Sequence, residues 1–249
     1  MTYRVLMNEV IKLLLSHRSI RRFADQVIPE QHVEACVRAG QMASTSSAVQ
    51  AYACIRIKDP GRRRALADLA GPQEKVSRAP EFFVICGDAR RHRLLCERAG
   101  VDYDQRMEGF LISVIDATLF AQNMVIAFES LGYGVCYTGG IRNDLPGVGR
   151  VLGLPQGVYP LYGLCVGVPA EIPAPRPRLP TEAVLFDDGY PTDEDVLASI
   201  DRFDATYRDY LAKRGATARG WGESIIEKMG HASRVSVGPY YRDQGAVMA

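Results

Sequence analysis

The chain has 249 residues, of which 47% are hydrophobic and 24% charged, and this ordinary composition argues against a disordered chain. Thirty basic and 29 acidic residues give a net charge of +1, whereas a domain that holds nucleic acid through many phosphate contacts is usually more basic. Five of the basic residues are lysine and 25 are arginine. Codon bias is the simplest explanation of this excess. The alternative is that some arginines bind a planar anion, because guanidinium is a rigid and permanently charged fork.

In the N-terminal half, helical and strand patterns alternate. Apolar spacing predicts a helix over 5–15, and Pro29 begins a second helix as its first-turn proline. A polar stretch at 44–47 follows. The next three predicted elements are a strand at 51–57, a turn and helix at 59–71, and a buried strand at 81–86.

The longest predicted helix runs from about Tyr103 to Leu131 and is apolar nearly all round, so it should be buried on most sides. An interior helix of this length in a chain of 249 residues suggests a core that a second subunit partly completes. Its central stretch is too polar for a lipid-facing span. The polar residues in that stretch are Ser113, Asp116, Thr118, Gln122 and Asn123.

The C-terminal half begins with short elements and ends in helices. The predicted elements are a strand at 135–138, a small helix ending near Leu152, a strand at 159–168, a proline-rich arm at 169–180, a helix at 194–213, a loop at 214–222, and a last helix and tail at 223–249. Helices therefore alternate with four or five strands, which is typical of a three-layer α+β fold. We expect one domain over 1–249, with C-terminal helices at 194–249.

The sequence also predicts a cytoplasmic location. The N-terminus carries Glu9 and Lys12 where a signal peptide needs an apolar core. No two of the six cysteines have metal-ligand or redox spacing, and most lie in apolar runs such as FFVICG. We interpret them as buried thiols in a reducing compartment. The four histidines lie far apart, so no metal site is predicted.

Two arginine clusters suit one dianionic group. The first is His17-Arg18-Ser19-Ile20-Arg21, in which two guanidinium groups, an imidazole and a hydroxyl follow a helix. The second is Arg176-Pro177-Arg178, where prolines fix the shape of the arm. Such groups neutralise and hydrogen-bond a phosphate. The alternatives are a solvated basic turn for the first cluster and a linker with chance arginines for the second.

Two further stretches suit a flat ligand. The strand ending in Tyr137-Thr138-Gly139-Gly140 lets backbone N–H groups approach a ligand closely, although a plain strand-to-helix turn has the same pattern. Residues 44–47, Gln50 and Gln73 offer hydroxyls and amides for the pyrimidine edge and ribityl chain of a flavin, and the alternative is an ordinary loop. A Walker A loop and a convincing G-x-G-x-x-G turn are missing, which excludes P-loop and Rossmann-type nucleotide binding.

Together and in this order, these features resemble the nitroreductase family, and in particular its subgroup of NADPH-dependent FMN enzymes. The segments that carry the resemblance are HRSIRRF at 17–23, the serine stretch with Gln50, GPQEKV around Gln73, AQNMVIAFESLGYGVCYTGGIRN at 121–143, LPQGVYPLYGLCVGVP at 154–169 and PRPRLP at 175–180. The resemblance implies a three-layer α+β fold with a central mixed, mostly antiparallel sheet. It also implies an intertwined homodimer with two FMN sites at the subunit interface.

The resemblance further implies roles for individual residues. The residues that would bind FMN are His17, Arg18, Ser19, Arg21, Thr45, Ser46, Gln50, Gln73, Tyr137, Thr138, Gly139, Gly140, Arg176 and Arg178. Arg21 would lie near N1 and O2 of the flavin ring and stabilise the negative charge that develops on reduction. Glu108 would order Arg21 or the substrate. Arg214 and Arg219 would recognise the 2′-phosphate of NADPH.

The implied activity is a ping-pong reaction in which NADPH delivers a hydride to FMN and a flat acceptor, such as a nitroaromatic or a quinone, is then reduced by two electrons. Ala48, where relatives often carry phenylalanine, should widen the acceptor pocket. One alternative is a flavin reductase that supplies reduced FMN to a partner. Another is a non-catalytic flavin-binding sensor, against which the intact arginine pair of the NADPH loop argues. Neither nucleic acid nor a membrane is predicted as a partner.

Overall fold

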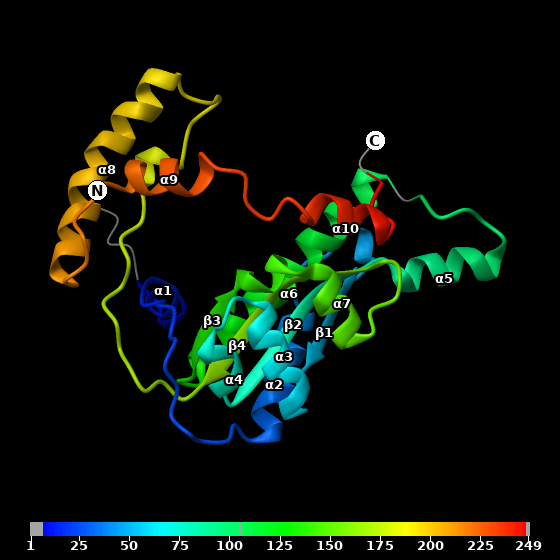
Figure 1. Ribbon diagram of the computed structural model, residues 1–249. Helices are drawn as coiled ribbons and strands as arrows, with labels where there is room; N and C mark the ends of the chain where they lie inside the picture. Colours follow the sequence, from blue (N-terminus) through cyan, green and yellow to red (C-terminus); the bar gives the residue numbers. More distant parts are fainter. Residues whose placement is uncertain (1–6, 105, 248–249) are drawn as a thin grey trace. The chain divides into compact units, whose positions relative to one another are not determined.

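A computed structural model describes residues 7–104 and 106–247, and the chain divides into two compact units (Figure 1). The first unit comprises Met1–Pro173 and Arg234–Ala249, and the second comprises Ala174–Ser233. That the two work as one FMN-binding domain over 1–249 stays a prediction.

The elements of each unit follow in chain order. The first unit contains α1 (Glu9–Leu15), α2 (Glu30–Gln41), the 3-10 helix η1 (Ser46–Ala48), β1 (Tyr52–Arg56), α3 (Pro60–Leu69), α4 (Glu74–Arg78), β2 (Glu81–Asp88), α5 (Arg90–Ala99), α6 (Met107–Ser130), β3 (Gly134–Thr138), η2 (Gly139–Asn143), α7 (Leu145–Leu152), β4 (Val158–Gly167) and α10 (Val237–Asp243). The second unit contains η3 (Thr181–Ala183), α8 (Asp193–Lys213) and α9 (Trp221–Met229).

The four strands form one sheet in the order β1-β2-β4-β3, so β1 and β3 are its two edges. All three pairs of neighbouring strands are antiparallel. Tyr52 at the start of β1 aligns through Gly87 with Tyr159, whereas Gly134 at the start of β3 aligns with Gly167. The starts of the two edge strands therefore lie at opposite ends of the sheet. The predicted, mostly antiparallel sheet is confirmed.

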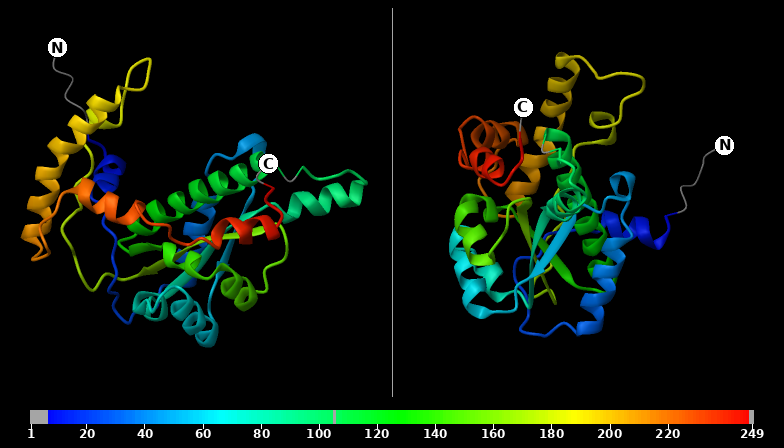
Figure 2. Two further views of the ribbon diagram at one scale, coloured as in Figure 1. Left: turned by 45° about the horizontal axis from the view of Figure 1, so that its top comes forward. Right: turned by 90° about the vertical axis from the view of Figure 1, so that its right-hand side faces the viewer.

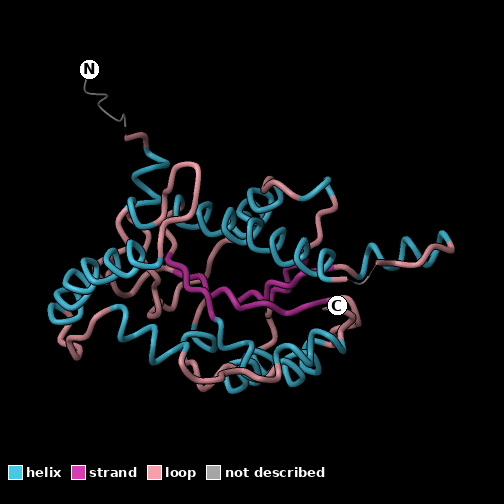
Figure 3. Tube along the Cα trace, turned by 90° about the horizontal axis from the view of Figure 1, so that it is seen from above, coloured by secondary structure: helices cyan, strands magenta, loops and turns pink. Residues whose placement is uncertain are grey.

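Helices cover both faces of this sheet. Contacts and core clusters place α2 and α6 on one face and α3, α4 and α7 on the other (Figures 2 and 3). The strand β2 is buried along its whole length, because successive side chains of EFFVICGD point to opposite faces. Phe83 and Ile85 join the cluster beneath α6, whereas Phe82 and Val84 join the cluster beneath α3 and α7. The predicted three-layer α+β architecture is confirmed.

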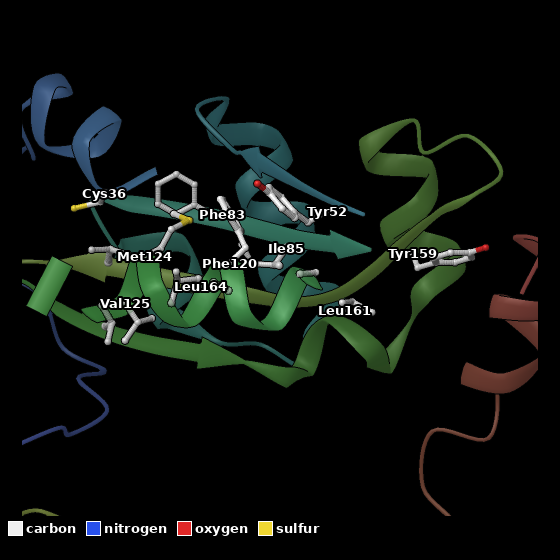
Figure 4. Close-up of a cluster of buried hydrophobic side chains, with 14 of the residues drawn as sticks. Cys36, Tyr52, Phe83, Ile85, Phe120, Met124, Val125, Tyr159, Leu161 and Leu164 are labelled. Carbon is white, nitrogen blue, oxygen red and sulfur yellow. The ribbon is translucent and has the colours of Figure 1, made fainter. Parts of the chain in front are cut away.

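The helix α6 supplies much of the core on its face of the sheet. Phe120, Met124 and Val125 are fully buried among side chains of the strands and of α2 (Figure 4). By length and apolar composition, α6 is the one helix in the described part of the chain that could cross a membrane. Its packing against three strands and α2 makes it a core helix of this fold.

The opposite face of α6 is apolar but uncovered. Leu111, Ile115 and Leu119 follow one another at four-residue spacing, and 40%, 51% and 43% of their surface is exposed. Residues at this spacing share one face of a helix. The expectation that this helix is buried on most sides is therefore not met within the single chain, and the uncovered stripe is large enough to need an occupant.

The second unit is helical and built around a few aromatic residues. The Thr192 hydroxyl caps α8 by accepting the Asp195 N–H at 3.2 Å. Phe203 and Tyr207 of α8 are buried, and the Phe203 ring lies 6.0 Å from the ring of Trp221 at the start of α9. This small core presents the loop between α8 and α9. The arm predicted at 169–180 has no helix or strand apart from a single bridge at its first residue.

Most predicted elements are confirmed to within a few residues, but the short helices α4 and α5 are not predicted. The helix α5 contains no buried residue and lacks a side-chain cap at Ala89, so neither an apolar stripe nor a capping residue marks it. Residues 5 and 6 of the first predicted helix lie outside the described residues, and the last helix is divided into α9 and α10.

Candidate functional site

The segment 17–21 lies along β3 at one edge of the sheet. Ser19 forms an isolated parallel bridge with Val135, and the Ile20 N–H donates to the Val135 carbonyl at 2.9 Å. Ile20 is buried against Gly134, where a Cβ would lie 2.6 Å from the Ile20 side chain. Because side chains alternate along an extended segment, buried Ile20 fixes the segment and directs Ser19 and Arg21 the other way.

His17 is oriented by a carboxylate of α6. Its Nδ1 lies 2.7 Å from Oε1 of Glu129, whose side chain is 12% exposed, while the His17 side chain is 29% exposed. An ionised carboxylate only accepts hydrogen bonds, so Nδ1 carries the hydrogen and Nε2 is left to meet a ligand. Sequence reasoning missed Glu129, which lies 112 residues from its partner.

The guanidinium groups of Arg18 and Arg21 are not neutralised by carboxylates. Arg18 donates to main-chain oxygens, including that of Pro173 at 3.3 Å, and Arg21 donates to the Ser19 carbonyl at 3.3 Å. Glu171 accepts from the Arg21 main-chain N–H at 2.9 Å and so holds the backbone. Among the described residues, no carboxylate lies within ion-pairing distance of either guanidinium. Both positive charges are therefore available to an anion.

Directly after β3, Gly140 packs against Ala70 and Gln73, and these three residues are called the cradle below. A Cβ at Gly140 would lie 2.3 Å from the Ala70 carbonyl oxygen and 2.6 Å from Nε2 of Gln73, so only glycine fits there. Gln73 is held in place, since its Nε2 donates to the Ala70 carbonyl at 3.0 Å. The structure thus brings Gln73 and the paired glycines together, as the flavin interpretation requires. Thr138 is buried against Cys165, with the hydroxyl oxygen 3.6 Å from the sulfur, so only its backbone can meet a ligand.

Lys75, beside the cradle, is a second residue that sequence reasoning missed. Its half-buried ammonium donates to Oε1 of Gln73. Burial raises the pKa of the neighbouring Cys136 thiol, and the nearby positive charges of Lys75 and Arg21 act in the opposite direction. Two cations therefore flank the end of β3. Lys75 lies two residues after Gln73 and is one of only five lysines in the chain, which was the available signal.

The loop carrying Thr45, Ser46 and Gln50 lies elsewhere in the first unit. It precedes β1, which is the edge strand opposite β3 and starts at the other end of the sheet. Three strand spacings separate the two edges, or about 14 Å. The loop and the segment 17–21 are thus not brought together within one chain.

Glu108 lies at the N-terminal end of α6. It is an exposed residue in the first turn, 21 residues before Glu129. At 1.5 Å per residue, this separation is about 32 Å along the helix axis. Glu108 therefore does not order Arg21 of the same chain, and any role beside a flavin would require a second copy.

In the second unit, Tyr210 joins two of the predicted arginines. Arg214 donates to the Tyr210 hydroxyl at 2.6 Å and also lies over its ring, 5.4 Å from the centroid. Burial alone raises the pKa of Tyr210, but hydrogen bonds from Arg214 and Arg176 together lower it below its usual value. Arg178 donates to the Arg176 carbonyl at 2.8 Å. The arginines of the arm and of the loop thus meet around one phenol.

Arg219 lines a cavity of about 870 Å³ in the second unit. The cavity is also lined by Arg176, Lys228 and the Trp221 side chain. Arg219 forms an ion pair with Glu227, an exposed residue of α9 that sequence reasoning missed. A cavity of this size with three cations in its wall can hold part of a phosphorylated nucleotide.

The geometry of the first unit fits FMN. Gly140 packs tightly against Ala70 and Gln73 at the end of β3, Gln73 offers an amide, and Arg21 and Lys75 supply uncompensated positive charge near this strand. Such charge stabilises electrons that are delivered to a flavin ring. His17 and Arg18, at the other end of the same edge, offer phosphate ligands.

Comparisons with known proteins extend this picture over the whole chain. A model described as "Nitroreductase family" matches residues 14–168, and one described as "Nitroreductase family, C-terminal domain" matches residues 176–248. The FMN reductase (NADPH) of Bacillus subtilis is 41% identical over 245 residues, which cover 96% of this chain and 98% of that protein. The oxygen-insensitive NADPH nitroreductase of Salmonella typhimurium is 39% identical over 242 residues, with 96% and 98% covered. The solved NfrA1 nitroreductase of B. subtilis superposes with a TM-score of 0.91 at 41% identity, covering 95% of this chain and 98% of that one.

Proposed function

This chain belongs to the nitroreductase family, and we propose that it is an FMN-dependent oxidoreductase that takes a hydride from NADPH and reduces a flat acceptor such as a nitroaromatic or a quinone. The observation that carries the proposal is the cradle at the end of β3. There Gly140 packs against Gln73 and Ala70, and Arg21 and Lys75 place positive charge beside β3.

The residues of the first unit divide the work of holding the cofactor. His17, Arg18 and Ser19 bind the phosphate end, with His17 held by Glu129 so that Nε2 faces the ligand. Tyr137, Thr138, Gly139 and Gly140 present main-chain groups along the ring, and Gln73 meets its pyrimidine edge. FMN, when bound, would supply the hydride and electron transfer between NADPH and the acceptor. Arg21 and Lys75 contribute electrostatic support; protons for the acceptor come from water.

The active form is a homodimer with a flavin site at each subunit interface. Two observations support it: the uncovered apolar stripe of Leu111, Ile115 and Leu119, and the separation of the loop 45–50 from the segment 17–21. A second copy that covers the stripe brings the loop, and Glu108, to the flavin of its partner. Ile115→Arg should give a monomer by analytical ultracentrifugation that retains no flavin, whereas an unchanged dimer would exclude this face from the interface.

The second unit provides the site for the 2′-phosphate of NADPH. Arg214 and Arg219 are the ligands that we assign to it, and the cavity beside them accommodates the adenosine part. The arm arginines, Arg176 and Arg178, are assigned to the FMN phosphate. The protein acts in the cytoplasm, where NADPH is supplied.

A second candidate function is favoured by the name of one relative, FMN reductase (NADPH). In that role, reduced FMN leaves the protein and serves a partner enzyme. Anaerobic reduction by NADPH followed by ultrafiltration separates the two functions. The oxidoreductase proposal predicts that flavin stays in the retentate with the protein, whereas flavin in the filtrate would support the flavin-reductase role.

A further inference from the structure

Asp116 is a wholly buried carboxylate in the middle of α6. One of its oxygens accepts the Ser46 main-chain N–H at 3.1 Å, and the other accepts the Ala51 N–H at 3.0 Å. Aspartate is a poor residue for a helix interior, and a buried carboxylate needs hydrogen-bond donors. Here the donors belong to the two ends of one loop, so the side chain spans the loop like a clamp.

The clamped loop has an unfavourable backbone. Ser47, Ala48 and Gln50 have positive φ angles of 45°, 57° and 50°, a region that residues other than glycine rarely adopt. Such a conformation persists only where the surroundings impose it. Besides Asp116, the His92 ring contributes a hydrogen bond, with Nε2 2.8 Å from the Val49 carbonyl oxygen.

The strained residues lie at the surface while their anchor lies beneath. Ser46, Ser47, Ala48 and Gln50 are exposed, whereas Asp116 is inaccessible to solvent. The clamp therefore orders an exposed surface that the core of the single chain does not require. A loop held in this way is preorganised for something that binds against it.

We propose that Asp116 is a positioning residue for flavin binding: its buried carboxylate fixes the loop 46–51 so that Thr45, Ser46 and Gln50 face FMN. The inference rests on the proposed function, because that function assigns the loop to the flavin of a partner subunit. The backbone N–H groups of Ser46 and Ala51 are satisfied by the carboxylate, which leaves the loop side chains for the ligand.

The test compares the full-length protein with Asp116→Asn, which keeps the size of the side chain but replaces one acceptor oxygen by a donor amide. The matched control is Ser113→Ala, one turn earlier on α6, where an equally buried hydroxyl donates to the Phe110 carbonyl of its own helix at 2.7 Å. FMN affinity is measured by fluorescence titration of the apoprotein, and folding of each variant by circular dichroism. We expect at least a tenfold rise in the Kd for FMN in folded Asp116→Asn and less than a twofold change in Ser113→Ala.

A Kd within twofold of the wild type in folded Asp116→Asn would overturn the proposal. Hydrogen exchange of the wild-type protein tests it independently of whether the variant folds: the Ser46 and Ala51 amides should be as protected as core amides, although their loop is exposed. Fast exchange at both would contradict the clamp. Gln50→Ala separates the role of Asp116 from the proposed function: if it leaves the Kd unchanged, Gln50 does not contact FMN, so the loop assignment and the role of Asp116 fail while FMN binding by the protein stands. If Gln50→Ala weakens binding and Asp116→Asn does not, only the role of Asp116 is wrong.

Discussion

The two units of the molecule hold their predicted ligands in different ways. In the first unit, the cradle packs Gly140 against the Ala70 backbone and the Gln73 side chain, beside a sheet whose strand β2 is fully buried. In the second unit, the predicted nucleotide residues Arg214 and Arg219 are exposed side chains on a loop, engaged with Tyr210 and with Glu227. The first site is thus closely packed, and the second is a set of exposed charges that already have partners.

The proposed function gives a reason for this difference. A cofactor that remains bound through many turnovers is best held by preorganised backbone groups, because their ordering is complete before binding. A reductant that must leave after each hydride transfer is better held by surface charges that exchange one partner for another. Exposed ion pairs are weak, so such exchange is easy.

The largest effect is expected at the cradle. In Gly140→Ala, the new methyl group would meet the Ala70 carbonyl oxygen at 2.3 Å, and backbone cannot move aside as a flexible side chain can. We expect a loss of about 3 kcal/mol in FMN binding or in the free energy of unfolding, as for overpacked sites. Flavin absorbance of the purified variant and urea unfolding measure the two. A variant that retains both would show that the cradle is not rigid.

Next in size is the phosphate end of the flavin site. Arg18→Ala and Arg178→Ala should each weaken FMN binding by about 1.5–3 kcal/mol, the range for lost charge-assisted hydrogen bonds. Isothermal titration of the apoproteins gives these values. If neither variant changes the affinity, the phosphate is bound elsewhere.

Two of the carboxylates of α6, Asp116 and Glu129, allow a comparison within the first unit. Asp116→Asn leaves a buried N–H without its acceptor and should lower the free energy of unfolding by about 1–3 kcal/mol. Glu129→Gln keeps an oxygen that can accept from His17, whose pair with Glu129 is mostly buried, and should lower it by less than about 1 kcal/mol. Urea unfolding measures the loss of stability in each variant. Equal losses would mean that the deeper burial of Asp116 does not make its hydrogen bonds more stabilising.

The smallest effect is expected at the exposed ion pair between Arg219 and Glu227 of the second unit. Glu227→Gln removes the partner of Arg219 and so frees its guanidinium for the 2′-phosphate. The KM for NADPH should fall a few-fold, which corresponds to less than about 1 kcal/mol of binding free energy, since an exposed ion pair contributes no more. The KM for NADH, which lacks that phosphate, should not move. Equal changes for both nucleotides would show that Arg219 does not read the 2′-phosphate.

Much of the fold could be predicted from the sequence because its signals are local. The apolar run of β2, the proline that starts α2 and the long apolar pattern of α6 each mark an element without reference to the rest of the chain. The segment 17–21 and the paired glycines were also predictable, because charge clusters and glycine pairs stand out in one dimension. The resemblance to a family then linked them.

Two of the residues that were missed act across long separations. Glu129 meets His17 over 112 positions, and Asp116 meets Ser46 over 70. In the sequence, Asp116 counts only as one of several polar residues that argue against a membrane span. Its partners are main-chain N–H groups, which carry no sequence signature. The separation of the loop 45–50 from the flavin cradle follows from strand order, which composition and periodicity do not reveal.

The central claim, that this protein passes electrons from NADPH through bound FMN, is tested most directly by anaerobic stopped-flow spectroscopy of the purified protein. We expect a yellow protein whose flavin absorbance bleaches on mixing with NADPH, and markedly more slowly with the same concentration of NADH. A protein that binds FMN but keeps its flavin absorbance after mixing with either nucleotide would contradict it.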